Sequence, residues 1–92
     1  MKILGYDYKL KCSTEMDTLG QANFKLLRIQ IADGYDEQQQ VSTVLHEVIE
    51  CVNYHLKIGL EERDVMGLEA GLYQVLTDAG IDLSPLVKEL KE

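Results

Sequence analysis

The sequence contains no tryptophan, one proline and two cysteines, and it has far fewer basic than acidic residues. Cys12 and Cys51 are too few for a disulfide framework, so we expect both to be reduced, small apolar side chains in a cytoplasmic protein. Nine Lys and Arg against 16 Asp and Glu give a net charge of −7, which argues against binding to nucleic acid or to an anionic membrane. No apolar run approaches the ~20 residues of a membrane span, and no signal-peptide pattern follows Met1.

Apolar residues make up 46% of the 92-residue chain, which predicts one small domain over residues 1–92. Alternating apolar and polar side chains predict a strand from Ile3 to Cys12 and a second strand from Phe24 to Ala32. The polar segment between them, residues 13–23, is typical of a loop. Two strands joined in this way most simply form an antiparallel pair.

A long helix is predicted after the second strand. Asp36 is a good N-cap, and Gln39 three residues later resembles the second half of a capping box. We expect the helix to end near Lys57, where Gly59 supplies a left-handed stop.

Two further helices follow. The first of them begins near Glu61 or Glu62, whose charges suit a helix N-terminus, and ends at Gly80. A short last helix begins with Ser84 as its N-cap and Pro85 at its first position, and it ends at Glu92. The order predicts an α+β domain in which a small antiparallel sheet is followed by a long helix, a second long helix and a short C-terminal helix.

The second long helix carries apolar or small side chains around nearly its whole circumference: Val65, Met66, Leu68, Ala70, Leu72, Tyr73, Val75 and Leu76. A helix that is apolar on more than one side is usually buried on more than one side. We therefore expect a homodimer, or contact with another protein, through this helix.

The most informative stretch is Val44–Cys51, which reads VLHEVIEC. On a helix, His46 and Glu50 are one turn apart and point the same way. The string H-E-V-I-E differs from the zinc-hydrolase motif H-E-x-x-H only in its last residue, and a carboxylate is an acceptable zinc ligand. The glutamate in second place, here Glu47, is the general base in that motif. A partly buried His46 that is simply hydrogen-bonded to Glu50 is the alternative.

A third ligand must come from elsewhere in the chain. His55 is nine residues from His46, which puts it on the opposite side of a continuous helix. Glu62 and Glu69 share one line of the next helix, beside an expected packing face that consists of Val65, Leu72 and Leu76. A carboxylate on a buried face needs a partner, and a shared metal would be one. Alternatively, Glu62 serves the helix dipole and Glu69 is an edge residue paired with solvent or lysine.

Two other side chains near the motif have both a functional and a packing interpretation. Tyr54, one turn after Glu50, is a candidate to hydrogen-bond a reacting oxyanion, or else a half-buried core tyrosine. Cys51 is a candidate soft ligand, but a lone cysteine at helical spacing more often serves packing.

Four segments resemble a group of small zincin-like proteins that are encoded by bacteriophages and prophages and described as metallopeptidases: Arg28–Ile31, Thr43–Glu50, Asn53–Tyr54 and Gly71–Leu76. The resemblance covers roughly residues 19 to 79. It implies a mini-zincin-like domain whose first long helix is the active-site helix. It also implies a zinc site held by His46, Glu50 and Glu62, with Glu47 as the base, in the cytoplasm of a bacterial host.

The chain departs from these relatives at Glu50, where they often carry a second histidine. Two carboxylates and one imidazole nearly neutralise a divalent ion, which weakens its effect on bound water. An oxygen-rich site also discriminates less between zinc and Mn²⁺ or another divalent ion. Two functions follow: a metal-dependent hydrolase, most simply a peptidase with a protein or peptide substrate, or a non-catalytic zincin-like module that binds a host or phage protein and whose metal site is structural or vestigial.

Overall fold

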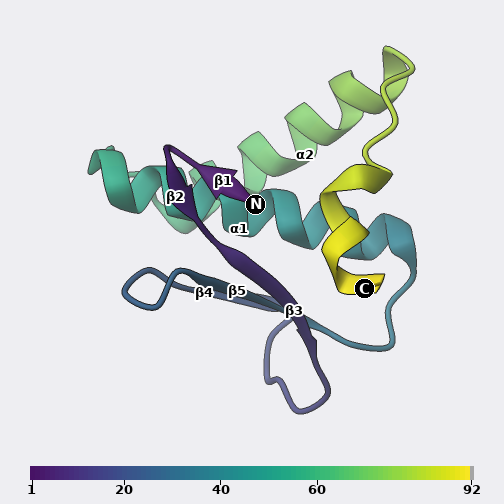
Figure 1. The fold of residues 1–92 in the computed structure, drawn as a ribbon. Coiled ribbons are helices and arrows are strands. Elements are labelled where there is room, and N and C mark those ends of the chain that lie inside the picture. The colour runs from purple at the N-terminus through teal and green to yellow at the C-terminus, as the bar shows by residue number, and fades with distance from the viewer. Residues whose placement is uncertain (92) are drawn as a thin grey trace.

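The computed structural model describes residues 1–91, which form five strands followed by three helices (Figure 1). The strands are β1 Lys2–Ile3, β2 Tyr6–Asp7, β3 Lys9–Ser13, β4 Gly20–Asn23 and β5 Arg28–Ala32. The helices are α1 Glu37–Leu56, α2 Glu62–Asp78 and the 3₁₀ helix η1 Ser84–Lys91. This confirms the predicted α+β layout. None of the helices in this part of the chain is long and apolar enough to cross a membrane.

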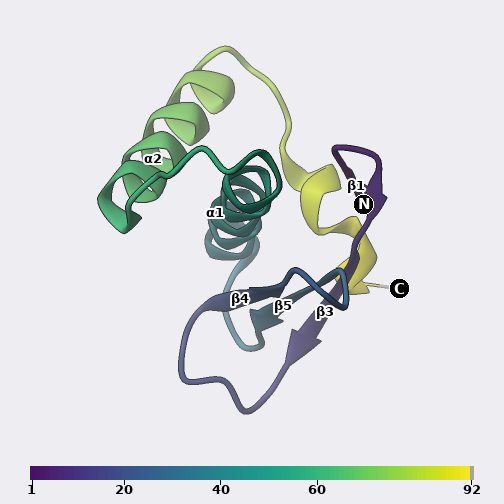
Figure 2. The same ribbon diagram turned by 90° about the vertical axis from the view of Figure 1, so that its left-hand side faces the viewer.

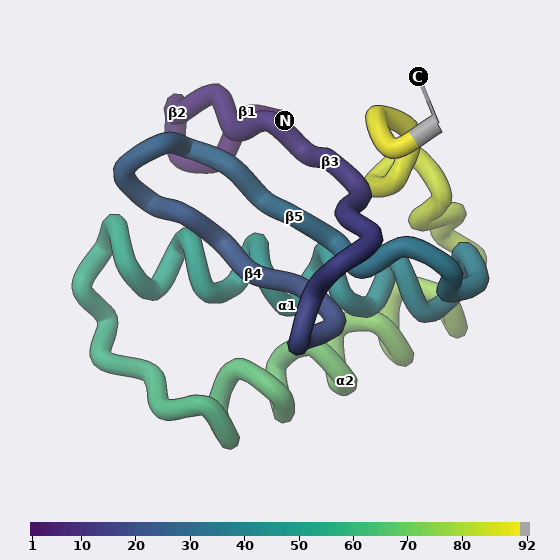
Figure 3. The backbone as a smooth tube through the Cα atoms, turned by 90° about the horizontal axis from the view of Figure 1, so that it is seen from below, coloured from purple at the N-terminus to yellow at the C-terminus, as the bar shows by residue number. Residues whose placement is uncertain are grey.

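The helix α1 lies across one face of a three-stranded sheet with the order β3-β5-β4. In Figure 2, α2 lies on the β4 side of α1, and η1 lies on the β3 side, next to the N-terminus. The core between these layers is formed by side chains that are almost completely buried: Tyr8, Ile29, Ile31, Val44, Cys51, Val65 and Val87. The strand β4 is therefore both an edge of the sheet and the strand nearest to α2 (Figure 3).

The first predicted strand is interrupted rather than continuous. Leu4 and Gly5 have φ angles of 52° and 84°, and this left-handed pair turns the chain so that β1 and β2 form a small antiparallel hairpin. The alternation of side chains over residues 3–12 did not reveal this turn, because Leu4 is apolar and gives no sign of it.

The predicted loop contains a strand, β4, at Gly20–Asn23. A tight turn then follows, in which the side-chain oxygen of Asn23 accepts hydrogen bonds from the backbone N–H groups of Lys25 and Leu26 at 3.1 and 2.9 Å. For this reason the next strand begins at Arg28 and not at Phe24.

The expected antiparallel pairing of the two longer strands was wrong. β3 and β5 are parallel, with Lys9 opposite Arg28, whereas β4 and β5 are antiparallel. The physical reason is the additional strand: the chain reverses once before β4 and again after it, so that β5 runs in the same direction as β3.

The ends of the helices agree with the capping signals, with two differences. The side chain of Asp36 accepts from the backbone N–H of Gln39 at 2.8 Å, as predicted. At the other end of α1 the first left-handed residue is Lys57, with φ 52°, and not Gly59. Before η1, Asp82 rather than Ser84 is the capping side chain, because it accepts from both the backbone N–H and the hydroxyl of Ser84.

Burial differs from the expectation at two positions. Cys51 is buried, as a packing role requires, but Cys12 is exposed. On α2, Val65 is the one buried residue, and Leu72, which was expected on the packing face, is 43% exposed.

Candidate metal centre

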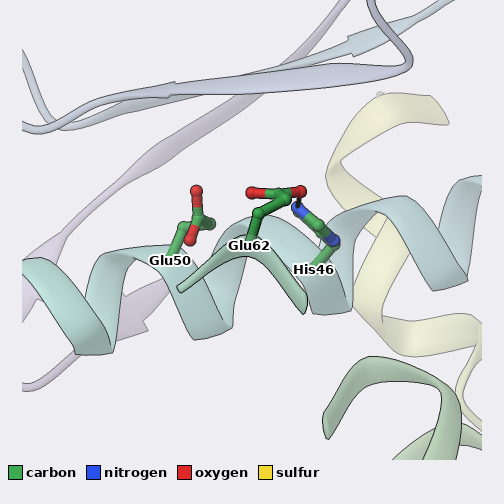
Figure 4. Close-up of side chains that lie close together, drawn as sticks. All are labelled: His46, Glu50 and Glu62. Atoms are coloured by element: carbon green, nitrogen blue, oxygen red, sulfur yellow. Dashed lines mark ion pairs between the residues drawn. The ribbon is translucent and has the colours of Figure 1, made fainter. Parts of the chain in front are cut away.

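Three potential metal ligands converge where α2 begins beside α1. His46 and Glu50 lie one turn apart on α1, and Glu62 is the first residue of α2. One ligand atom from each of the three lies within 4.8 Å of the others, and Figure 4 shows their side chains gathered above α1. The His46 Nε2 and Glu62 Oε1 atoms are 3.3 Å apart. The structure thus brings together the three side chains that the family resemblance implies as ligands.

The connection between the helices explains how Glu62 reaches this position. The side-chain oxygen of Asn53 accepts from the backbone N–H of Leu60 at 2.9 Å, and its amide donates to the carbonyl of Leu60 at 3.3 Å. This pair of bonds ties the connection back onto the last turns of α1. As a result, α2 starts close to the middle of α1.

The three side chains fit a divalent cation. Ligand atoms about 2.1 Å from a tetrahedrally coordinated ion lie about 3.4 Å from one another. The distance of 3.3 Å between His46 Nε2 and Glu62 Oε1 matches this spacing. Because the ligand atoms of all three residues lie within 4.8 Å of one another, the Glu50 carboxylate would have to move only a short way toward the other two. One imidazole nitrogen and two carboxylate oxygens suit zinc or manganese.

The second ring nitrogen of His46 is held by Glu69. His46 Nδ1 lies 2.8 Å from Glu69 Oε1, and the other oxygen of Glu69 accepts a hydrogen bond from the Ser42 hydroxyl. This arrangement places the proton on Nδ1 and leaves Nε2 available as a ligand, as in many metal sites where a carboxylate orients the histidine. Glu69, which the sequence presented as an extra ligand or an edge residue, therefore lies behind the histidine.

The charges around His46 raise its pKa. Burial by itself lowers the pKa, but the hydrogen bond to Glu69 and the nearby carboxylates of Glu47 and Glu62 outweigh it. An ion that binds Nε2 must displace the second proton of the charged ring, which the raised pKa favours, whereas the proton on Nδ1 stays. The affinity for the ion should therefore fall in acid.

Glu47 follows His46 on α1 and is buried, with 7% of its surface exposed, in a cavity that the three candidate ligands also line. Burial raises its pKa to about 7; the imidazole of His46 opposes this effect, and the carboxylates of Glu50, Glu62 and Glu69 add to it. Within residues 1–91 no donor is hydrogen-bonded to the Glu47 carboxylate. Its oxygens are therefore free to accept a proton from a group in the cavity.

The cavity has a volume of about 650 Å³. Its walls are formed by the segment before and along β4, by α1, and by the first two turns of α2, and they consist of Thr18, Leu19, Gly20, Gln21, Ala22, Phe24, Gln39, Thr43, His46, Glu47, Glu50, Glu62, Met66 and Glu69. At Gly20 the backbone comes so close to α1 that an added Cβ would lie 2.6 Å from Thr43 Cγ2 and 3.2 Å from Glu47 Oε2. The edge strand β4 is thus pressed against the helix that carries the candidate ligands.

The remaining candidates from the sequence lie elsewhere. Tyr54 is half exposed and stacks on Phe24 at a ring distance of 4.1 Å, outside the walls of the cavity. His55 lies on the opposite side of α1, where its Nε2 is 2.5 Å from the Tyr8 hydroxyl and its ring stacks on Tyr6. Cys51 is buried in the core, and its pKa is raised to about 11, chiefly by burial. None of the three contributes to the metal centre.

Two residues of the site, Ser42 and Gly20, have only weak signals in the sequence. Ser42 is one turn before His46, and this i, i+4 spacing is the local signal that might have linked it to the histidine side of α1. Gly20 was hidden in a segment that looked like a loop.

Comparisons with known proteins give no match to any family model, curated protein or solved structure.

Proposed function

We propose that this chain is a divalent-metal-dependent hydrolase that cleaves peptide bonds, with zinc or manganese held by His46, Glu50 and Glu62. The observation that carries the proposal is the convergence of these side chains on one cavity that also contains the buried carboxylate of Glu47. The resemblance to zincin-like proteins points the same way.

In this proposal Glu47 is the general base and then the general acid. Its carboxylate takes a proton from the attacking water and returns it to the leaving amine. A bound divalent cation would supply Lewis acidity, which polarises the substrate carbonyl and makes water easier to deprotonate. Glu69 keeps the His46 ring in place through Nδ1, so that Nε2 faces the cavity.

The edge strand β4 is the natural place for a peptide substrate. The outer edge of a sheet presents unpaired backbone N–H and C=O groups, and an extended peptide can add to it as another strand. Alternate side chains of such a peptide would face α1 and the cavity, and its backbone would pass beside the carboxylates of Glu47 and Glu62.

A non-catalytic, protein-binding module is the second candidate. Two carboxylates and one imidazole leave little net charge on a divalent ion, which reduces its power to activate water. In addition, α2 exposes several large apolar side chains that a partner protein could cover: Met66, Leu68, Leu72 and Val75. In this case we expect a metal that supports the fold, without hydrolysis.

Calorimetric titration of zinc and manganese into chelator-treated protein, together with a quenched-fluorescent peptide library, tests the proposal. We expect His46→Ala to abolish metal binding and Glu47→Gln to retain binding but lose hydrolysis. Glu62→Gln should weaken binding, whereas Glu61→Gln, which removes the neighbouring acid at the same helix end, should not. If neither ion binds more tightly than about 1 mM, or roughly −4 kcal/mol, the metal site is refuted. Metal binding without any cleavage would favour the second candidate.

A further inference from the structure

The outer face of the three-stranded sheet carries only basic and uncharged side chains. The strands β3, β4 and β5 contain no acidic residue at all, although acids outnumber Lys and Arg by 16 to 9 in the chain. We call the following residues the basic face: Lys9 and Lys11 of β3, Gln21 and Asn23 of β4, Lys25 of the turn, and Arg28 and Gln30 of β5. They alternate with the inward-facing Leu10, Ile29 and Ile31, which are buried.

The stability of the fold does not account for these charges. Lys9 lies directly opposite Arg28, and like charges in register on neighbouring strands repel each other. Among residues 1–91, none of the four cations of the basic face forms an ion pair. Lysines on the edge strand β3 can protect it against unwanted pairing, but Arg28 is on the central strand and Lys25 is in a turn.

A second cavity lies between the basic face and the free edge of β4. This cavity has a volume of about 460 Å³, and its walls include Lys25, Arg28 and the stacked rings of Phe24 and Tyr54. It shares Gln21, Ala22 and Phe24 with the metal cavity. The two cavities therefore adjoin along the same edge strand.

From this arrangement we infer that the chain selects acidic peptides, which pair with β4 so that their carboxylates meet Arg28 and Lys25. Side chains alternate along an extended strand, so that one set would face the metal cavity and the other set the basic face. Arginine and carboxylate form strong, charge-assisted hydrogen bonds. The assignment of a cleaved substrate rests on the proposed hydrolase function, but the binding of an acidic strand does not.

An acidic peptide suits this surface better than a nucleic acid. The basic face itself contains no aromatic ring on which bases could stack, and on it Gln21 donates to Gln30 at 2.7 Å. In the adjoining cavity the rings of Phe24 and Tyr54 already stack on each other at 4.1 Å. The glutamates of the metal cavity would repel a phosphate backbone along the same edge. A peptide can place carboxylates on one side only, whereas a nucleic acid strand carries a phosphate at every step.

Fluorescence anisotropy with the full chain tests the inference. The probes are a labelled peptide of alternating threonine and glutamate, its threonine–glutamine counterpart, and a labelled oligothymidine. Alternation places every glutamate on the same side of an extended strand. We expect chelator-treated protein to bind the glutamate peptide at least about tenfold more tightly than the glutamine peptide, and salt near 1 M, where the Debye length is about 3 Å, to remove the difference.

Charge-reversal variants locate the binding surface. Arg28→Glu and Lys25→Glu should each weaken binding of the glutamate peptide by about tenfold, while the matched variant Lys88→Glu, at an exposed position of η1, should leave it unchanged. Circular dichroism checks that each variant is folded. Equal binding of the two peptides, equal effects of Lys25→Glu and Lys88→Glu, or tighter binding of oligothymidine would overturn the inference.

Adding zinc separates this inference from the proposed function. Selective binding without cleavage of either peptide supports the acidic-strand site and counts against the hydrolase. Cleavage of both peptides at equal rates supports the hydrolase and counts against the acidic-strand site.

Discussion

The ring of His46 is held on both sides by carboxylates from α2, with Glu69 on Nδ1 and Glu62 near Nε2. An ion bound by both His46 and Glu62 would take the place of the direct contact at Nε2, whereas the contact between Nδ1 and Glu69 would remain and keep the ring oriented. Because Glu69 also accepts from the Ser42 hydroxyl, it is fixed from a second direction. Glu69 is thus a positioning residue, whose loss should affect metal affinity although it is not a ligand.

We predict that Glu69→Gln lowers zinc affinity by about 10- to 100-fold, as the loss of such orienting carboxylates does in other metal sites. The amide can still bond the ring, but it no longer favours the tautomer with the proton on Nδ1. Competition titration against a fluorescent zinc chelator measures the change. Asp78→Asn, which removes one acid from the same helix far from His46, is the control, and an equal loss in both variants would point to net charge instead.

The raised pKa of Glu47 predicts a pH-dependent stability. Folded Glu47 keeps its proton up to a pH of about 7, whereas the ordinary value is 4.5. The folded state then holds more protons than the unfolded state, so the free energy of unfolding falls as the pH rises from about 4.5 to 7. Glu47→Gln removes this fall. In chelator-treated protein we expect the variant to match wild type near pH 4 and to be more stable by roughly 1–3 kcal/mol near pH 8.

Urea unfolding at the two pH values measures this difference. A constant offset between Glu47→Gln and wild type at both pH values would mean that Glu47 has an ordinary pKa. His46 contributes a slope of the same sign above its ordinary pKa of 6.5, because its own pKa is raised. Glu47→Gln makes that slope smaller, because the Glu47 carboxylate is one cause of the raised pKa of His46.

The sequence revealed the residues of the site that follow helical periodicity. His46 and Glu50 share one face because of their i, i+4 spacing, and Glu62 was expected at the start of the next helix. The partner of His46 could not be assigned in the same way. Glu69 becomes that partner only because the Asn53–Leu60 hydrogen bonds set how α2 lies against α1, and this tertiary geometry has no periodic signal in the sequence.

The approach of β4 to α1 depends on Gly20. A methyl group there would lie 2.6 Å from Thr43 Cγ2, so β4 would have to move away from the helix. We predict that Gly20→Ala destabilises the fold by about 1–3 kcal/mol, as overpacking does, and impairs any hydrolysis. Gly67→Ala is the matched variant: a Cβ at this helical position meets nothing within 4 Å, and it should stabilise the fold by roughly 0.5–1 kcal/mol. Urea denaturation measures the free energy of unfolding of both variants. A value for Gly20→Ala equal to that of wild type would show that β4 is not closely packed on α1.

The helices could be predicted from the sequence better than the strands could, because their end signals are local. Asp36 caps α1 through Gln39, two residues within one turn of each other. Strand pairing is not local in this sense. The turn at Asn23 lets the preceding segment, which was predicted to be a loop, pair with β5 as the strand β4. With this additional strand, β5 runs parallel to β3 and not antiparallel to it. The alternation of side chains shows neither effect.

At the scale of the whole molecule, charge is divided between two sides of one edge strand. The side facing α1 carries the carboxylates of Glu47, Glu50, Glu62 and Glu69, and the outer side leads to Arg28 and Lys25. A divalent cation would offset the first set, and acidic side chains of a peptide would offset the second. The metal proposal therefore depends on the acidic side of β4, and the peptide proposal depends on the basic side. Their effects can be measured separately.

The helix α2 is the least anchored large element of the fold. Val65 is its one fully buried residue, and four large apolar side chains on its surface are 43% to 65% exposed: Met66, Leu68, Leu72 and Val75. Its first turn is tied to α1 by the contact between Glu62 and His46. A cation shared by His46, Glu50 and Glu62 would join the two helices directly, so metal binding should stabilise α2 more than the sheet.

We predict that zinc slows hydrogen exchange of the α2 amides and affects the strands β3 and β5 much less. At a free zinc concentration of about 100 times the Kd, the binding free energy allows up to roughly 100-fold slower exchange through local opening. Mass spectrometry of peptides covering residues 62–78, with and without zinc, measures this effect, and His46→Ala should remove it. Without metal, exchange of α2 should be faster than that of α1. If instead it is equally slow and becomes slower with protein concentration, a second copy of the chain covers the exposed apolar face, as the homodimer prediction requires, and the metal is not what holds α2.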